Sequence, residues 1–175
     1  MVSLTVIFWM YIILFAIIGA MRGWAKELLV SFSVILALAL NHLLRRYIPM
    51  VTSLDIASTS LFWIRVGITV PLVFFGYQTV ASIGHLASKA KKDKLQDALF
   101  GAVMGGVNGY LVMGTLWNYL DEAKYPFKGI FITPPSDIAA EIAEMMLKMP
   151  PHFLGEPGIY FAVIIAFIFI IVVYV

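Results

Sequence analysis

The stretch LTVIFWMYIILFAIIGAM at residues 4–21 decides the fold class, because it runs without a single charged side chain. A helix crosses the hydrocarbon core of a bilayer with about 20 mostly apolar residues, each rising about 1.5 Å. Further apolar stretches of this kind occupy residues 28–44, 60–83, 99–120 and 158–175. The sequence therefore predicts an all-α, polytopic membrane protein with about five transmembrane helices.

The composition of the whole chain agrees with lipid as the surrounding medium. Hydrophobic residues make up 62% of it and charged residues 13%, with a mean hydropathy of +0.95. Soluble domains carry about 25% charged residues. The net charge of +2 is small and its basic residues sit in short connections, which excludes nucleic-acid binding as a function class. The absence of cysteine excludes disulfides, thiolate metal sites and cysteine nucleophiles.

Three parts follow one another along the chain. Residues 1–120 form a predicted four-span membrane core, residues 121–157 an extracytoplasmic connection, and residues 158–175 the fifth transmembrane helix. Within the connection, residues 137–149 predict an amphipathic interfacial helix, with the hydroxyl of Ser136 as its N-cap. It either lies on the membrane surface or packs over the span ends as a lid. Its apolar face comprises Ile138, Ile142, Met145 and Met146, and its polar face comprises Glu141, Glu144 and Lys148.

The distribution of basic residues predicts the orientation, because cytoplasmic connections carry an excess of Lys and Arg. Arg22 and Lys26 lie in the first connection, and four lysines lie at residues 89–94, which we call the lysine-rich bend. We therefore expect both connections in the cytoplasm and the amino terminus outside. The lysine-rich bend is expected to contact anionic lipid headgroups.

Glycines four residues apart mark the stretch at residues 99–120 as a packing helix. Gly101, Gly105 and Gly109 stack on one helix face. Such glycines let a second backbone approach closely, and van der Waals contact then holds helices together in lipid. The spacing predicts a helix–helix seam, either within the chain or between protomers.

Two polar side chains inside the spans need partners. Arg65 is the formal charge well inside a predicted span, where it either contacts an ion or substrate or extends to the outer interface. Asn41, His42 and Asp55 are its expected partners. Asn108 lies mid-span among the glycines and predicts an interhelical hydrogen bond, or else the polar lining of a pathway.

No pattern of residues predicts catalysis or a cofactor. The three histidines, His42, His85 and His152, mostly belong to different depths, so we expect neither a haem nor a metal site. His42 with His152 is the pair that stays open as an alternative, because both belong to the outer side. The sequence contains no carboxylate pair, phosphate-binding loop or nucleophile elbow. We therefore expect a protein that is not an enzyme and binds no cofactor.

Two segments resemble the colicin V production protein (CvpA) family of bacterial inner-membrane proteins. They are GAMRGWAKE at residues 19–27, and DALFGAVMG at residues 97–105 followed by Gly109. The resemblance covers residues 3–120, and the connection and fifth span lie beyond it. The matching positions are Arg22, Gly23, Asp97, Gly101 and Gly105.

The resemblance implies a four-span core in the bacterial inner membrane that serves toxin production or export, or envelope homeostasis, through helix–helix assembly. It carries no catalytic residues. A homo-oligomer or a larger membrane complex is the expected assembly. Two alternatives stay open: an accessory structural subunit of a respiratory or photosynthetic complex, and a small transporter or channel that uses Arg65, Asn108 and His42.

The predicted orientation can be tested by protease mapping of the lysine-rich bend, residues 89–94. Trypsin added to cells with a permeabilised outer membrane should leave the bend intact, and trypsin added to inverted membrane vesicles should cut it. The acidic connection at residues 121–157 serves as the matched control, because it should show the opposite pattern. Cleavage of the bend from the outside would contradict the assigned orientation.

Overall fold

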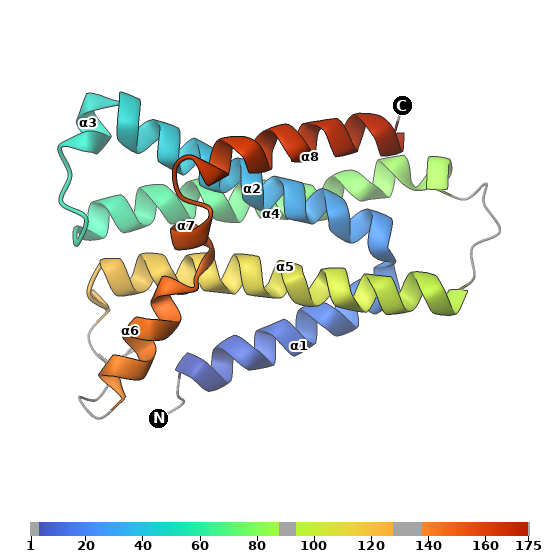
Figure 1. Cartoon of the computed structure of the whole chain (residues 1–175), viewed down its shortest axis with the longest axis horizontal. Coiled ribbons are helices and arrows are strands. Elements are labelled where there is room, and N and C mark those ends of the chain that lie inside the picture. Colours follow the sequence, from blue (N-terminus) through green and yellow to red (C-terminus); the bar gives the residue numbers. More distant parts are fainter. Residues whose placement is uncertain (1–3, 88–93, 128–137, 175) are drawn as a thin grey trace. The chain divides into compact units, whose positions relative to one another are not determined.

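A computed structural model describes residues 4–87, 94–127 and 138–174, and every regular element in these ranges is a helix. Figure 1 shows the helices in chain order. They are α1 (Leu4–Arg22), α2 (Trp24–Tyr47), α3 (Pro49–Thr52), α4 (Thr59–Ala87), α5 (Lys94–Glu122), α6 (Ala139–Leu147), α7 (Pro150–Phe153) and α8 (Gly158–Tyr174). The predicted all-α class is confirmed.

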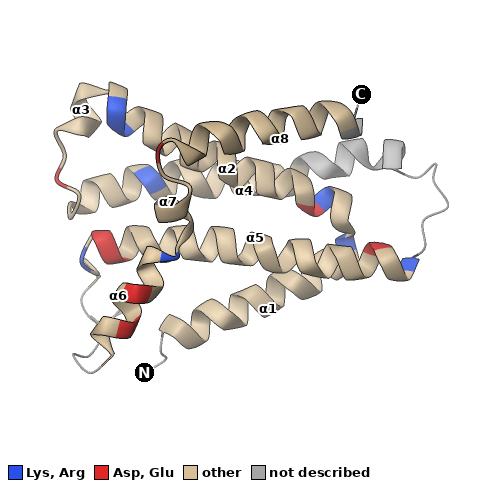
Figure 2. Ribbon diagram, in the orientation of Figure 1, with Lys and Arg blue, Asp and Glu red and all other residues tan. Residues whose placement is uncertain are grey.

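Four of these helices are long and apolar enough to cross a membrane: α1, α2, α4 through its segment Thr59–Gln78, and α5. The protein is therefore a multi-pass membrane protein. Helix α8 has 17 residues and carries no charge (Figure 2), but its length of about 26 Å is shorter than a hydrocarbon core of about 30 Å. A full crossing by residues 158–175 stays a prediction.

The first hairpin is tighter than the sequence predicts. Helix α1 ends at Arg22 and α2 begins at Trp24, so Gly23 alone connects them. Its φ of 89° lies in the left-handed region, which glycine adopts at little cost. The Gly23 amide donates to the Gly19 carbonyl at 2.9 Å and ends α1. As a result, Glu27 lies in the first turn of α2.

The predicted amphipathic helix is present as α6, which begins at Ala139. Ile142 and Met146 are buried, whereas Glu144 and Lys148 are exposed and form an ion pair at 2.8 Å. The Lys148 ammonium lowers the pKa of the Glu144 carboxyl. Ser136 and the lysine-rich bend, apart from Lys94, lie outside the described residues.

The chain forms two compact units, each assembled from segments that are distant in sequence. Unit 1 comprises Met1–Val34 and Pro71–Gly114, and unit 2 comprises Ile35–Val70 and Thr115–Val175. Helices α2, α4 and α5 each contribute one part to either unit. The division of the chain at residues 120 and 157 stays a prediction.

In unit 1, glycines bring the backbones of α1 and α5 into direct contact. A Cβ atom placed on Gly19 would lie 2.8 Å from the Gly105 Cα, and one placed on Gly105 would lie 2.9 Å from the Gly19 Cα. A Cβ atom on Gly101 would collide with the Gly19 carbonyl, and one on Gly109 would lie 2.9 Å from the Phe15 Cβ. The glycine face of α5 thus packs against α1 of the same chain.

In unit 2, a hydrogen bond between two aromatic side chains lies near the carboxyl end of α5. Lys124 and Tyr125 both have positive φ, and the Tyr125 amide donates to the Leu120 carbonyl at 3.0 Å, which ends the helix. The Trp117 indole donates to the Tyr125 hydroxyl at 3.2 Å. Burial raises the pKa of Tyr125 to about 12.

Because the glycine face of α5 packs closely against α1, we predict that Gly105→Ala lowers the thermal stability of the protein in detergent. The added methyl collides with the Phe15 backbone, which cannot move aside as a side chain would, and such overpacking costs about 1 to 3 kcal/mol. Gly67→Ala is the matched control, because a Cβ atom there meets nothing within 4 Å. Its unfolding temperature should equal or exceed that of the parent. Equal stability of the two variants would contradict the seam.

Candidate functional site

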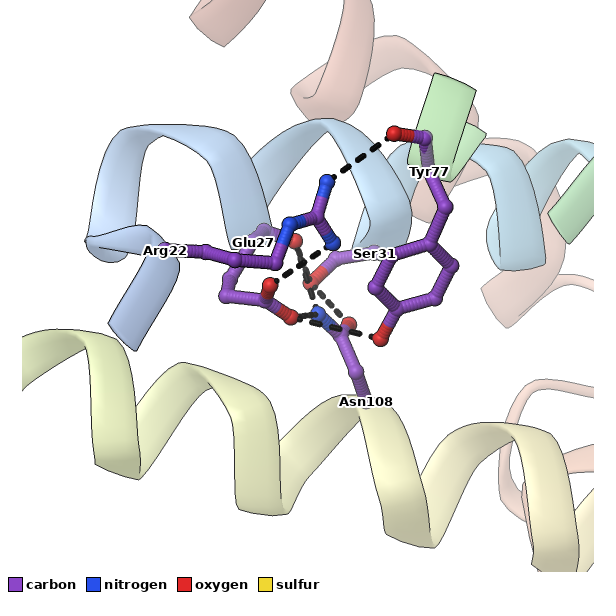
Figure 3. A network of polar contacts seen from close by, with 5 residues as sticks. All are labelled: Arg22, Glu27, Ser31, Tyr77 and Asn108. Atoms are coloured by element: carbon purple, nitrogen blue, oxygen red, sulfur yellow. Dashed lines mark hydrogen bonds and ion pairs between the residues drawn. The ribbon is translucent and has the colours of Figure 1, made fainter. Parts of the chain in front are cut away.

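A cluster of polar side chains lies inside unit 1 around Glu27 (Figure 3). The Glu27 side chain is fully buried, with 0% exposure. Its carboxylate accepts hydrogen bonds from the Arg22 guanidinium at 3.0 Å, the Asn108 amide at 2.9 Å and the Tyr77 hydroxyl at 3.4 Å. We call Arg22, Glu27, Ser31, Tyr77 and Asn108 the interior network.

Asn108 connects α5 to α2 at two successive turns. Its Nδ2 donates to the Glu27 carbonyl at 2.8 Å, and its Oδ1 accepts from the Ser31 hydroxyl at 2.7 Å. Glu27 and Ser31 are four residues apart and therefore share one face of α2. This gives Asn108 the interhelical hydrogen bonds that its mid-span position requires.

Arg22 links the ends of α1 and α2 to α4. One of its nitrogens pairs with Glu27, and another donates to the Tyr77 carbonyl at 3.0 Å. Its guanidinium carbon lies 4.2 Å from the centre of the Tyr77 ring, within cation–π range. The single cation of the network is thus held by one carboxylate, one carbonyl and one aromatic face.

The interior network is closed. No side-chain atom of its five members is among the buried polar atoms that lack a hydrogen-bond partner in the described part of the chain. A buried charge is tolerated when it is paired and its remaining hydrogen-bonding capacity is used. The arrangement is that of a structural cluster that ties α1, α2, α4 and α5 together.

The remaining motif residues meet beside this cluster. A Cβ atom placed on Gly23 would lie 2.6 Å from an oxygen of the Asp97 carboxylate. Asp97 belongs to the first turn of α5, and Gly23 directly precedes α2. The carboxylate therefore lies next to the amino end of α2, where the helix dipole favours a negative charge. A glycine at position 23 leaves room for it.

In unit 2, Arg65 is buried and forms an ion pair with Glu122. Its guanidinium carbon lies 5.0 Å from the centre of the Tyr119 ring. Arg65 is therefore satisfied inside the protein by a carboxylate from the last residue of α5.

The expected partners of Arg65 are corrected in part. Asp55 is exposed and accepts a hydrogen bond from the Ala57 amide at 2.9 Å. Asn41 donates to the Arg65 carbonyl at 3.5 Å and to the Thr69 hydroxyl at 3.1 Å. The expectation failed because Glu122 was assigned to the following connection, whereas α5 continues through it.

His42 lies at the edge of a polar cavity of about 310 Å³ in unit 2. Its Nε2 is 3.6 Å from the carboxylate of Glu156, which also accepts a hydrogen bond from Arg46 at 2.7 Å. Both ends of the Arg65–Glu122 pair line the same cavity.

The structure brings Arg65 and His42 to one unit and places Asn108 in the other. Glu27, Tyr77 and Glu122 are interior groups that the sequence did not predict. Glu27 follows Arg22 by five residues across a glycine, which was the available signal. No local pattern points to Tyr77, whose role depends on where α4 packs. Within the described residues, no group of three His, Asp or Glu side chains is placed to hold a metal ion.

Comparison with known proteins assigns the chain to a family. The model of the family described as colicin V production protein matches residues 4–132. The chain belongs to the colicin V production (CvpA) family. No curated protein and no solved structure matches it. The resemblance found in the sequence is confirmed, and the match extends it to residue 132.

The two CvpA-like segments, residues 19–27 and 97–109, both lie in unit 1. They supply Arg22, Glu27 and Asn108 of the interior network as well as the seam glycines. The residues that carry the resemblance therefore build the packing of this unit.

The ion pair predicts a non-additive double-mutant cycle. Glu27→Gln leaves the Arg22 cation without its carboxylate and should destabilise the protein by about 2 to 4 kcal/mol. Adding Arg22→Met removes that cation, while the side-chain amide introduced by Glu27→Gln still offers an oxygen to Asn108, so the double variant should recover more than half of the loss. Unfolding temperatures in one detergent measure both effects. Additive losses would show that the pair is not coupled.

Proposed function

We propose that this CvpA protein is a non-enzymatic component of the bacterial inner membrane that supports toxin production and export, or envelope homeostasis, through helix–helix assembly. The observation that carries the proposal is the closed interior network, in which the buried Glu27 has its partners within the chain. Such a cluster fixes the relative positions of helices, and its polar groups are occupied by one another rather than offered to a solute.

The proposed assembly uses the outward apolar faces of the helices. The seam glycines of α5 face α1 of the same chain, so they are not offered to a second protomer. Large apolar side chains remain exposed on α1, among them Ile13 and Ile17, and on α8, among them Ile164 and Ile168. These faces support contacts with lipid, with copies of the chain or with other membrane subunits. The amino terminus is placed outside in this proposal, following the basic connections.

The experiment compares structural and proton-transfer roles for Glu27. The Arg22→Met/Glu27→Gln double variant has no titratable carboxylate at position 27. In a colicin V-producing strain without its own family member, this variant should give the same zone of growth inhibition per amount of membrane-inserted protein as the parent chain. The packing variant Gly105→Ala is the control, because its activity should fall in proportion to the amount of folded protein.

A well-folded double variant without activity would contradict the proposal, because the packing would then be intact and only the charged groups of Arg22 and Glu27 would have been removed. Failure of the parent chain to restore export would argue against a role in toxin production. Stoichiometric co-purification with cofactor-bearing subunits under mild detergent would favour the accessory subunit of a respiratory or photosynthetic complex.

A small transporter or channel is the second candidate, and the polar cavity beside Arg65 and Glu122 is the observation that favours it. Solute flux in proteoliposomes that falls with Arg65→Gln would support this function. Flux equal to that of protein-free liposomes would contradict a transporter or channel function.

A further inference from the structure

The polar cavity of unit 2 is lined by α2, α4, α5 and the segment at residues 151–155, and it is partly open. Asn41, His42 and Arg45 line it from α2, Arg65 from α4 and Glu122 from α5, with Leu38 and Leu154 as apolar walls. Arg45 lies near the carboxyl end of α2, and Glu122 is the last residue of α5. These positions correspond to the end of a span, where lipid headgroups meet protein.

Two buried polar atoms at the cavity make no hydrogen bond among the described residues. The Asn41 side chain is 7% exposed, and its Nδ2 is engaged by Thr69, but its buried Oδ1 accepts no hydrogen bond. The buried Nε2 of His42 also makes no hydrogen bond, although the Glu156 carboxylate lies 3.6 Å from it. Buried polar groups in folded proteins are nearly always satisfied, so an unpartnered acceptor at a cavity indicates a bound donor.

Some of the charged groups at the cavity form ion pairs within the protein and others do not. Arg65 and one oxygen of Glu122 occupy each other. In the described part of the chain Arg45 makes no ion pair, although it is partly buried. The cavity therefore offers a guanidinium that lacks an anion, and two oxygens, on Asn41 and Glu122, that can accept from a donor.

We propose that this cavity binds a zwitterion that joins a primary ammonium to a phosphate, the chemistry of phosphoethanolamine. The ammonium donates to the Asn41 Oδ1 and to the Glu122 carboxylate. The phosphate accepts from the Arg45 guanidinium and from His42 when its Nε2 carries a proton. The ammonium thus meets the unpartnered Asn41 Oδ1, and the phosphate meets Arg45, which makes no ion pair in the described part of the chain.

The spacing along α2 accommodates a spacer of this length. Asn41 and Arg45 are four residues apart, so their side chains start from one helix face about 6 Å apart along the axis. Phosphoethanolamine separates its charged groups by two carbons and an oxygen, whereas one carbon separates those of an α-amino acid. The same headgroup chemistry comes either from phosphatidylethanolamine or from free phosphoethanolamine. Leu38 and Leu154 give the cavity apolar walls, which suit contact with the acyl chains of a lipid.

Native mass spectrometry of the delipidated full-length protein tests the proposal. The probes are phosphatidylethanolamine, phosphatidylglycerol with the same acyl chains, O-phosphoethanolamine and glycine, each added to protein in detergent. We expect adducts with phosphatidylethanolamine at about tenfold lower concentration than with phosphatidylglycerol, which lacks the ammonium. Binding of O-phosphoethanolamine but not of the lipid would identify a soluble source of the same chemistry.

The variants separate the cavity from general surface charge. Asn41→Leu and Arg45→Gln should each weaken binding about tenfold, whereas Arg45→Lys, which keeps the cation, should retain most of it. Arg46→Gln is the matched control, because it removes the same charge one residue further along and Arg46 does not line the cavity. Size-exclusion profiles and unfolding temperatures establish that each variant is folded. If Asn41→Leu does not fold, the comparison of lipid binding by Arg45→Gln with lipid binding by Arg46→Gln tests the proposal.

Equal binding of the two lipids, or equal loss in Arg45→Gln and Arg46→Gln, would overturn the proposal in favour of non-specific charge attraction. Absence of any adduct would also overturn it. Preferential binding of glycine, which has no phosphate, would contradict the proposal that the cavity binds a phosphate.

Discussion

The buried carboxylate of Glu27 sets the strictest condition on this protein, because a charge inside a membrane helix bundle has no water to solvate it. It is accommodated only where a guanidinium, an amide and a hydroxyl from other segments converge on it. Each donor comes from a different helix. Positions of α1, α4 and α5 around α2 are therefore coupled, and a shift of any one of them leaves a polar group in unit 1 without its partner.

The glycine seam makes this convergence possible. Asn108 reaches the Glu27 carbonyl only when α5 lies close to α2, and the contact of Gly19 with Gly101 and Gly105 fixes α5 against the end of α1 from which Arg22 extends. Close backbone packing supplies van der Waals attraction, which replaces the hydrophobic effect between helices in lipid. The hydrogen bonds then specify the register. In unit 2, the Arg65–Glu122 ion pair likewise joins α4 to α5.

The CvpA-like motif residues have physical roles in this arrangement. Gly23 provides a left-handed turn and the space beside which Asp97 lies, and Arg22 provides the cation for Glu27. These roles stabilise a packed membrane unit, which is consistent with membership of a family defined by toxin production. The cavity beside Arg45 differs in kind, because its polar groups are incompletely satisfied by the protein itself.

The sequence by itself determined the all-α membrane fold, four of the spans and the packing face of α5, since these depend on local hydropathy and on residues four apart along one helix. It also located Arg65 and Asn108 as polar groups that need partners. Only the tertiary structure decided which partners they have. Glu122 is remote in sequence from Arg65, and Glu27 from Asn108. The choice among several available acids depends on helix ends and on the relative rotation of packed helices. Neither the helix ends nor the relative rotation of the helices can be read from the spacing of residues along a single segment.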